Sequence, residues 1–168
     1  MELATVPLLL ALAGLTLYLV LGGADFGAGF WQLVAPRGEH GARIRTLAHE
    51  SMAPVWEANH VWLIFVLVVM WTAYPEALAS IASTLVVPLF IGAVGIIFRG
   101  ATYALRAGAA RARELRAIDV TFAISSILTP FALATIVGAI ATGEVPVGNA
   151  AGDEWSSWTN PTSLMVGA

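Results

Sequence analysis

Residues 6–33 of the chain read VPLLLALAGLTLYLVLGGADFGAGFWQL and contain a single charged side chain, Asp25. Crossing the hydrocarbon core of a bilayer takes about 20 apolar residues in a helix that rises about 1.5 Å per residue. The stretch is long enough for this, and its polar and apolar residues do not alternate strictly. Because lipid offers the backbone no hydrogen-bond partners, such a stretch predicts a membrane-spanning helix.

Three further apolar runs, at 54–71, 77–98 and 120–141, have the same character. We therefore predict an all-α membrane protein, a four-helix transmembrane bundle formed by residues 1–142. Pro88 and Pro130 fall inside the third and fourth runs. Each lacks an N–H group and is expected to bend its helix.

The composition supports this fold class and excludes several functions. Of the 168 residues, 58% are hydrophobic and only 11% are charged, whereas a soluble domain carries about 25% charged residues. The absence of cysteine excludes disulfides, cysteine-ligated zinc and a thiol nucleophile. A net charge of −3 without any lysine excludes a nucleic-acid-binding protein. The predicted environment is the lipid bilayer.

The arginines predict the orientation of the bundle. All basic residues fall in two segments, before the second run and around the connection between the third and fourth: Arg37, Arg43, Arg45, Arg99, Arg106, Arg111, Arg113 and Arg116. The opposite side carries only acidic residues: Glu2, Glu76, Glu144, Asp153 and Glu154. By the positive-inside rule the arginine-rich connections are cytoplasmic, and both chain ends lie outside.

The last part of the chain predicts a change of structure. Residues 143–160 read as an outer loop, and Asn160-Pro161 has the form of a helix N-cap followed by proline at the first helical position. The apolar residues 161–168 would then be the start of a truncated fifth transmembrane helix.

Asp25 lies within the glycine-rich segment 22–29 of the first run. Gly23 and Gly27 form a pair of small residues that favours close packing of another helix. A bare charge inside a membrane helix costs on the order of 3 kcal/mol unless it is paired, hydrated or protonated. Asp25 is therefore a candidate functional group, although it could also be an interfacial residue of a helix that has already left the bilayer.

The second polar group opens the second run. Helical spacing places Trp56, Asn59 and His60 on one face, and Glu57 lies in the same turn. Glu57 could simply favour the helix dipole, but an acid, an amide and an imidazole within one turn are more than anchoring needs. A lone histidine is a weak indication of heme or metal ligation. His40 and His49, in the arginine-side loop, are expected to face water.

Arg99 closes the third run. It is either an anchor that reaches the interface or a counter-charge to Asp25, to Glu57 or to an acidic group of a partner. Thr121, Ser125 and Thr129 follow one face of the fourth run and are expected to support packing.

Three motifs resemble subunit II of the cytochrome bd family of quinol oxidases. They are GADFGAG at 23–29, APVWEANHVWL at 53–63 and Phe98-Arg99. The second motif is long and specific, and the order of the three agrees with the family. Many members carry Asp where this chain has Glu57, so the acid is kept but lengthened.

This resemblance implies a membrane subunit that binds no heme itself and pairs with subunit I. Subunit I would carry two b-type hemes and one d-type heme, oxidise quinol and reduce oxygen to water, and a small third subunit is possible. By the same resemblance, Asp25 and Glu57 are expected to transfer protons from the cytoplasm. Trp56, Asn59, His60 and Arg99 are expected at the subunit interface or in support of heme. The implied location is a bacterial or archaeal cytoplasmic membrane.

Two other classes stay open from the residues alone. Glycine-rich spans with intramembrane carboxylates are also typical of one half of an ion-coupled or proton-coupled secondary transporter. A purely structural membrane subunit without a proton-transfer role is the third interpretation.

Overall fold

The computed structural model of the chain describes residues 3, 5–148 and 150–168, with residues 52–54 described by their backbone alone. Glu2 lies outside the described residues. Four helices are long and apolar enough to cross a membrane: Thr5–Val34, Val55–Ala73, Val86–Arg106 and Ala112–Ala141. The prediction of an all-α protein with four candidate membrane spans is confirmed.

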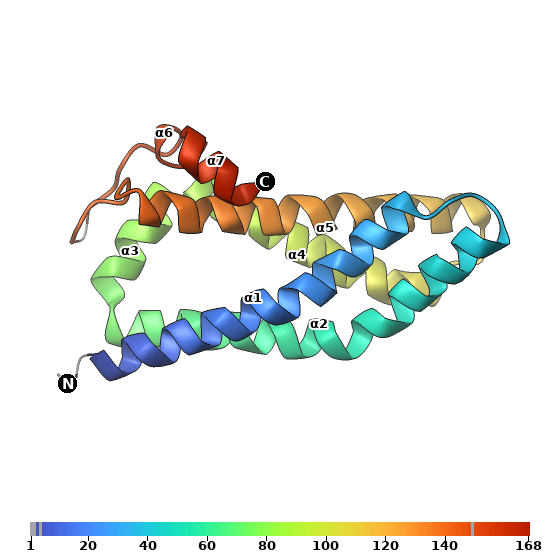
Figure 1. Cartoon of the computed structure of the whole chain (residues 1–168), viewed down its shortest axis with the longest axis horizontal. Coiled ribbons are helices and arrows are strands. Elements are labelled where there is room, and N and C mark those ends of the chain that lie inside the picture. The colour runs from blue at the N-terminus through green and yellow to red at the C-terminus, as the bar shows by residue number, and fades with distance from the viewer. Residues whose placement is uncertain (1–2, 4, 149) are drawn as a thin grey trace.

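The helices in chain order are α1 (Thr5–Val34), α2 (Glu39–Ala73), α3 (Pro75–Thr84), α4 (Val86–Arg106), α5 (Ala112–Ala141), α6 (Ser156–Thr159) and α7 (Pro161–Gly167). The long helices form two packed pairs, α1 with α2 and α4 with α5, and contacts between α1 and α5 join the pairs. Figure 1 shows the α1–α2 and α4–α5 connections together at one end of the bundle and α3 at the other. The arginine-rich segments therefore share one end, which we call the arginine-rich end.

Helix α2 begins earlier than predicted. The segment before residue 54, expected to be a loop, is helical from Glu39 onward, so that expectation was wrong. Gly38 precedes the helix with a φ of +96°, a conformation that side chains disfavour. The helix thus begins before the apolar part of the sequence. The prediction missed this because hydropathy indicates which part of a helix can cross lipid, not where the helix begins.

The third apolar run is interrupted. Helix α3 ends at Thr84 and α4 begins at Val86, with Leu85 between them. Pro88 occupies the first turn of α4, where a missing N–H group costs nothing. The predicted bend at Pro88 is therefore a break just before it. Pro130, by contrast, lies inside α5, which continues as one helix.

The break at Leu85 faces the segment that follows α5. The Ser80 hydroxyl lies 2.6 Å from the carbonyl oxygen of Pro146 and 2.7 Å from that of Ala150. The Gly152 N–H group donates to Thr84 Oγ1 at 2.8 Å. We call these contacts the loop clasp. They fix Pro146, Ala150 and Gly152 against α3.

Helix α7 starts as the sequence predicts. The Asn160 side chain accepts a hydrogen bond from the Ser163 N–H group at 2.9 Å, and Pro161 is the first helical residue. Helix α7 packs along α5 and runs back from the end that carries α3 (Figure 1). Its role as the start of a fifth membrane span stays a prediction.

Apolar side chains cover the outside of the bundle, and polar ones fill much of its interior. Large exposed residues include Val20, Phe90 and Trp71, the last 74% exposed. The largest fully buried side chains include Arg99, Asn59 and Asp25. This is the inverse of a soluble protein and fits helices that face lipid outside and satisfy polar groups inside.

Candidate functional site

The centre of the bundle holds an ion pair between Asp25 of α1 and Arg99 of α4. Both side chains are 0% exposed. Arg99 Nη2 donates to Asp25 Oδ1 and also to the Asp25 backbone oxygen, the latter at 2.9 Å. Of the partners the sequence left open for Arg99 within this chain, the structure selects Asp25. The two charges cancel, which lowers the cost of placing them inside a membrane bundle.

Two other helices complete the shell around the pair. Asn59 of α2, fully buried, donates from Nδ2 to Asp25 Oδ2 at 3.3 Å. Ser126 of α5 accepts a hydrogen bond from Arg99 Nη1 and donates its own hydroxyl proton to the Phe122 carbonyl oxygen at 2.6 Å. The pair therefore connects all four membrane-crossing helices at one point.

Aromatic rings enclose the Arg99 guanidinium. Its Cζ atom lies 4.7 Å from the ring centre of Phe26 and 4.6 Å from that of Phe122. A cation over an aromatic face gains about 0.5–2 kcal/mol, more where water is excluded. These rings hold the positive charge while keeping the site dry, which strengthens the attraction to Asp25.

Close helix packing at the site depends on two glycines that sequence reasoning did not single out for it. A methyl group at Gly29 of α1 would overlap Ser126, and one at Gly95 of α4 would overlap Thr129. A methyl group at Gly23 or Gly27 would have no described atom within 4 Å. No described residue of this chain packs closely on Gly23 or Gly27, and close packing of another helix there stays a prediction.

The structure brings together only some of the predicted site residues. Asp25, Asn59 and Arg99 meet, but Glu57 is exposed on α2 and makes no hydrogen bond or ion pair with any described residue. The expected cluster of Asp25, Glu57 and Arg99 is thus incomplete. The face of α2 that carries Glu57 also carries exposed Val61, so this carboxylate points away from the packed pair.

Trp56 and His60 lie half-buried beside this cluster. Their rings are 5.1 Å apart, and His60 Nδ1 donates to the Trp56 carbonyl oxygen at 2.8 Å. Among the described residues, neither Trp56 Nε1 nor His60 Nε2 has a hydrogen-bond partner. Each of the two rings therefore keeps one open polar atom. Within the described part of the chain, no three His, Cys, Asp or Glu side chains gather in a way that could hold a metal ion.

Sequence reasoning missed Phe26, Phe122 and Ser126. Phe26 adjoins Asp25, but nothing in the sequence shows that its ring covers an arginine. The polar ridge predicted on the fourth run included Ser125, whose hydroxyl donates to the Thr121 carbonyl oxygen at 2.6 Å. The residue that binds Arg99 is its neighbour, which lies just off that ridge.

A second group of charges lies at the arginine-rich end. Arg106 of α4 forms an ion pair with Asp119 of α5, and the side chains are 20% and 25% exposed. His49 packs on Tyr103 with ring centres 4.9 Å apart and is half-buried, which corrects the expectation that it faces water. Burial, and then the nearby charge of Arg106, lower the pKa of His49, and Glu50 opposes them.

Four apolar helices around a buried, neutralised ion pair define a multi-pass membrane protein with a polar interior. Comparison with known proteins makes this more specific. The family model described as cytochrome bd terminal oxidase subunit II matches residues 3–168, and the chain belongs to this family.

Two curated proteins of Bacillus subtilis (strain 168) are similar to the chain. "Putative cytochrome bd menaquinol oxidase subunit II" is 29% identical over 72 residues, covering 43% of this chain and 20% of that protein. "Cytochrome bd ubiquinol oxidase subunit 2" is 24% identical over 119 residues, covering 71% of this chain and 34% of that protein. The chain thus matches about a third of these relatives or less.

Proposed function

We propose that the chain acts as subunit II of a cytochrome bd-type terminal oxidase that oxidises quinol and reduces oxygen to water. In this proposal it forms a heterodimer with a heme-bearing subunit I, with a small third subunit in some complexes. The hemes, two of b type and one of d type, belong to subunit I. The complex lies in a bacterial or archaeal cytoplasmic membrane, with the arginine-rich end facing the cytoplasm.

One observation carries the proposal. The three family-like motifs lie on α1, α2 and α4, far apart in sequence, yet Asp25, Asn59 and Arg99 meet in one hydrogen-bonded group. A membrane subunit whose family-like residues converge in its interior is suited to support a partner, because this group fixes the positions of the helices that the partner contacts. The proposed role is therefore first of all to hold the heme-bearing subunit in place.

The proposal includes proton transfer by Glu57 and Asp25. Glu57 is exposed on α2, where a partner subunit or water can reach it. Asn59 of the same turn donates to Asp25, and His60 offers an open Nε2 atom nearby. Carboxylates can relay protons because they change protonation state. Glu57 is therefore the carboxylate that we propose takes up the proton first.

The decisive experiment compares Glu57→Gln with Glu57→Asp in the full-length subunit, co-purified with its partner. Gln cannot exchange protons, so quinol-dependent oxygen consumption is expected to fall by more than about tenfold at unchanged heme content. Asp restores an acid and should recover much of the activity. Glu57 lies 18 residues after the start of α2 at Glu39, too far from the helix N-terminus for a helix-dipole role, which acts only within the first turn.

Glu76→Gln is the matched control, because Glu76 is also an exposed carboxylate on a helix but lies on α3. It should respire normally. Normal respiration of the Glu57→Gln variant with full heme content would contradict the relay, leaving a scaffold. Substrate-dependent flux through liposomes, with no heme-bearing partner, would instead support the transporter interpretation.

A further inference from the structure

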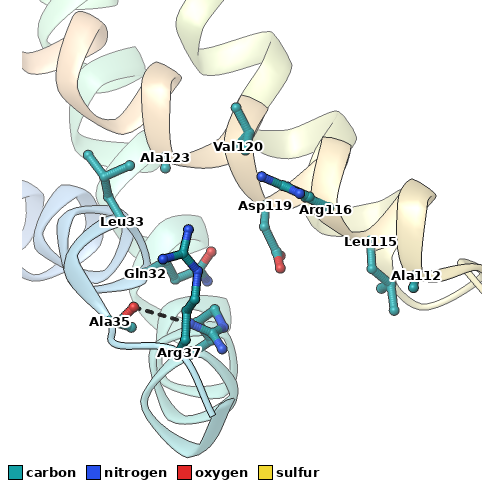
Figure 2. A pocket seen from close by; sticks show the side chains of 11 residues that line it. Gln32, Leu33, Ala35, Arg37, Ala112, Leu115, Arg116, Asp119, Val120 and Ala123 are labelled. Atoms are coloured by element: carbon teal, nitrogen blue, oxygen red, sulfur yellow. Dashed lines mark hydrogen bonds between the residues drawn. The ribbon is translucent and has the colours of Figure 1, made fainter. Parts of the chain in front are cut away.

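A pocket of about 540 Å³ opens at the arginine-rich end, apart from the buried ion pair. Its walls come from the end of α1, the loop that follows it, Arg45 of α2 and the first turns of α5. Figure 2 shows the guanidinium groups of Arg37, from the loop, and Arg116, from α5, directed into the space between these elements. The pocket thus lies where the membrane-crossing part of α1 ends and that of α5 begins.

The pocket has an excess of positive charge. Arg37, Arg45 and Arg116 line it, and Asp119 is its one acidic residue. Asp119 is already paired with Arg106, which does not line the pocket. The charge of the Asp119 carboxylate is therefore balanced by an arginine outside the pocket, and the charges of the three lining guanidinium groups remain for a ligand. Arg45 also holds the wall in shape, because its Nη1 donates to the Pro36 carbonyl oxygen at 3.3 Å.

The deeper wall is apolar. Leu33 of α1 and Val120 and Ala123 of α5 line it, whereas Leu115 lies beside Arg116 near the start of α5. Ala123 lies 11 residues beyond Ala112, about 16 Å along the helix axis at about 1.5 Å per residue. The pocket therefore runs from guanidinium groups at the membrane surface to aliphatic side chains at the depth of acyl chains.

Gln32 adds a polar group to the inner wall. Its side chain is 7% exposed, and its Oε1 atom has no hydrogen-bond partner among the residues described. A buried amide oxygen without a partner is unfavourable. A ligand with a hydroxyl donor next to its phosphate would satisfy this atom while its phosphate binds the arginines.

We propose that this pocket binds the headgroup of an anionic phospholipid. The phosphodiester would be held by Arg37 and Arg116, the headgroup hydroxyls by Gln32, and the acyl chains would lie along Val120 and Ala123. Guanidinium groups bind phosphate oxygens with paired, charge-assisted hydrogen bonds. Basic pockets between membrane helices are known sites for anionic headgroups. The inference does not rest on the proposed oxidase activity.

The apolar depth of the pocket favours a lipid over an acidic segment of a partner protein. A carboxylate side chain would use the arginines but leave Val120 and Ala123 uncovered. A soluble phosphate compound would do the same. A phospholipid alone matches both the charged mouth and the aliphatic wall.

The test uses the detergent-purified complex of the full-length subunit. Bound lipid is counted by native mass spectrometry, and thermal stability is measured, after addition of phosphatidylglycerol or of phosphatidylcholine with the same acyl chains. Glycerophosphoglycerol, which has the headgroup without chains, is the soluble competitor. Arg37→Gln combined with Arg116→Gln is compared with Arg113→Gln, an exposed arginine that does not line the pocket.

Phosphatidylglycerol is expected to bind and stabilise the complex, and phosphatidylcholine is not. The double variant should lose at least about tenfold in lipid affinity, since each charge-assisted contact contributes about that factor. Arg113→Gln should bind normally. Equal binding of both lipids, or equal affinity for the soluble competitor, would overturn the proposal. Loss of the partner subunit from the double variant with phosphatidylglycerol binding intact would overturn it too, and would assign the pocket to a protein segment.

Discussion

Two arginines of α4 form ion pairs with aspartates in very different surroundings. Arg99 and Asp25 are fully buried in the centre of the bundle. Arg106 lies two turns further along α4 and pairs with Asp119 while both remain about a fifth to a quarter exposed. The residue types are the same, but no water reaches the inner pair to solvate a charge left alone. The burial of each ion pair, and not merely its presence, therefore decides how much stability is lost when one partner is removed.

The largest expected effect comes from Arg99→Ala. Removing one partner of a buried pair leaves Asp25 uncompensated and costs about 3–5 kcal/mol. The yield and heme content of the purified complex should fall sharply. Arg111→Ala is the control, since the Arg111 side chain is 83% exposed and its pair with Glu114 is worth under about 1 kcal/mol.

A double variant sharpens this comparison. Asp25→Asn combined with Arg99→Gln removes both charges and should recover part of the lost yield, because no bare charge remains. Equal heme content in the Arg99→Ala and Arg111→Ala variants would show that the buried ion pair matters no more to the complex than the exposed one.

Gly29→Ala tests the packing that encloses the inner pair. The added methyl group would overlap Ser126 and force α1 and α5 apart, at an expected cost of about 1–3 kcal/mol. Gly27→Ala is the matched control on the same helix, where the methyl group meets no described atom within 4 Å. Thermal unfolding of the purified complex separates the two. Similar melting temperatures would mean that the helices at Gly29 can shift freely.

Asp119→Asn tests the outer pair. Because both side chains are partly hydrated, the loss should be about 1 kcal/mol, several-fold below that of Arg99→Ala. The effect should also shrink as salt is added, whereas that of Arg99→Ala should not. A cost equal to that of Arg99→Ala would remove the distinction between the two regions.

The smallest effect concerns His49, next to the outer pair. Its pKa is lowered from 6.5 in the folded protein, so the unfolded chain binds more protons near and below that pH. Stability is therefore lost as pH falls from about 6.5 toward the lowered pKa, by a few tenths of a kcal/mol at a half-exposed site. His49→Gln should flatten the melting temperature between about pH 7.5 and about pH 5.5, an interval of about two units around that pKa. An unchanged slope would show that His49 takes no part.

Hydropathy and arginine placement predicted the four spans and their common arginine-rich end, because lipid imposes both on the sequence. They did not predict the extension of α2 to Glu39 or the break at Leu85. The extension lies before the apolar part of the second run, where hydropathy sets no limit, and the break depends on contacts with residues far along the chain. Local pattern carries no information about such contacts.

The sequence predicted only the part of the candidate site that a membrane makes costly. Asp25 and Arg99 stand out because charge inside a membrane is costly, and their motifs resemble a known family. The rings of Phe26 and Phe122 are unremarkable in an apolar sequence, and only the three-dimensional packing shows that they cover a guanidinium. For Glu57 the sequence predicted too much. Its motif places it in the same turn as Asn59, but its side chain is exposed and does not join the buried ion pair.

The loop clasp has a consequence for how this protein is made. Ser80 and Thr84 bind backbone groups of Pro146, Ala150 and Gly152, which are synthesised much later than α3. While the ribosome is still producing α4 and α5, these hydroxyls have no such partners. Contacts between distant parts of a chain form slowly. Closure of the clasp is therefore a late step of biogenesis, and it can occur only after α5 has been threaded across the bilayer.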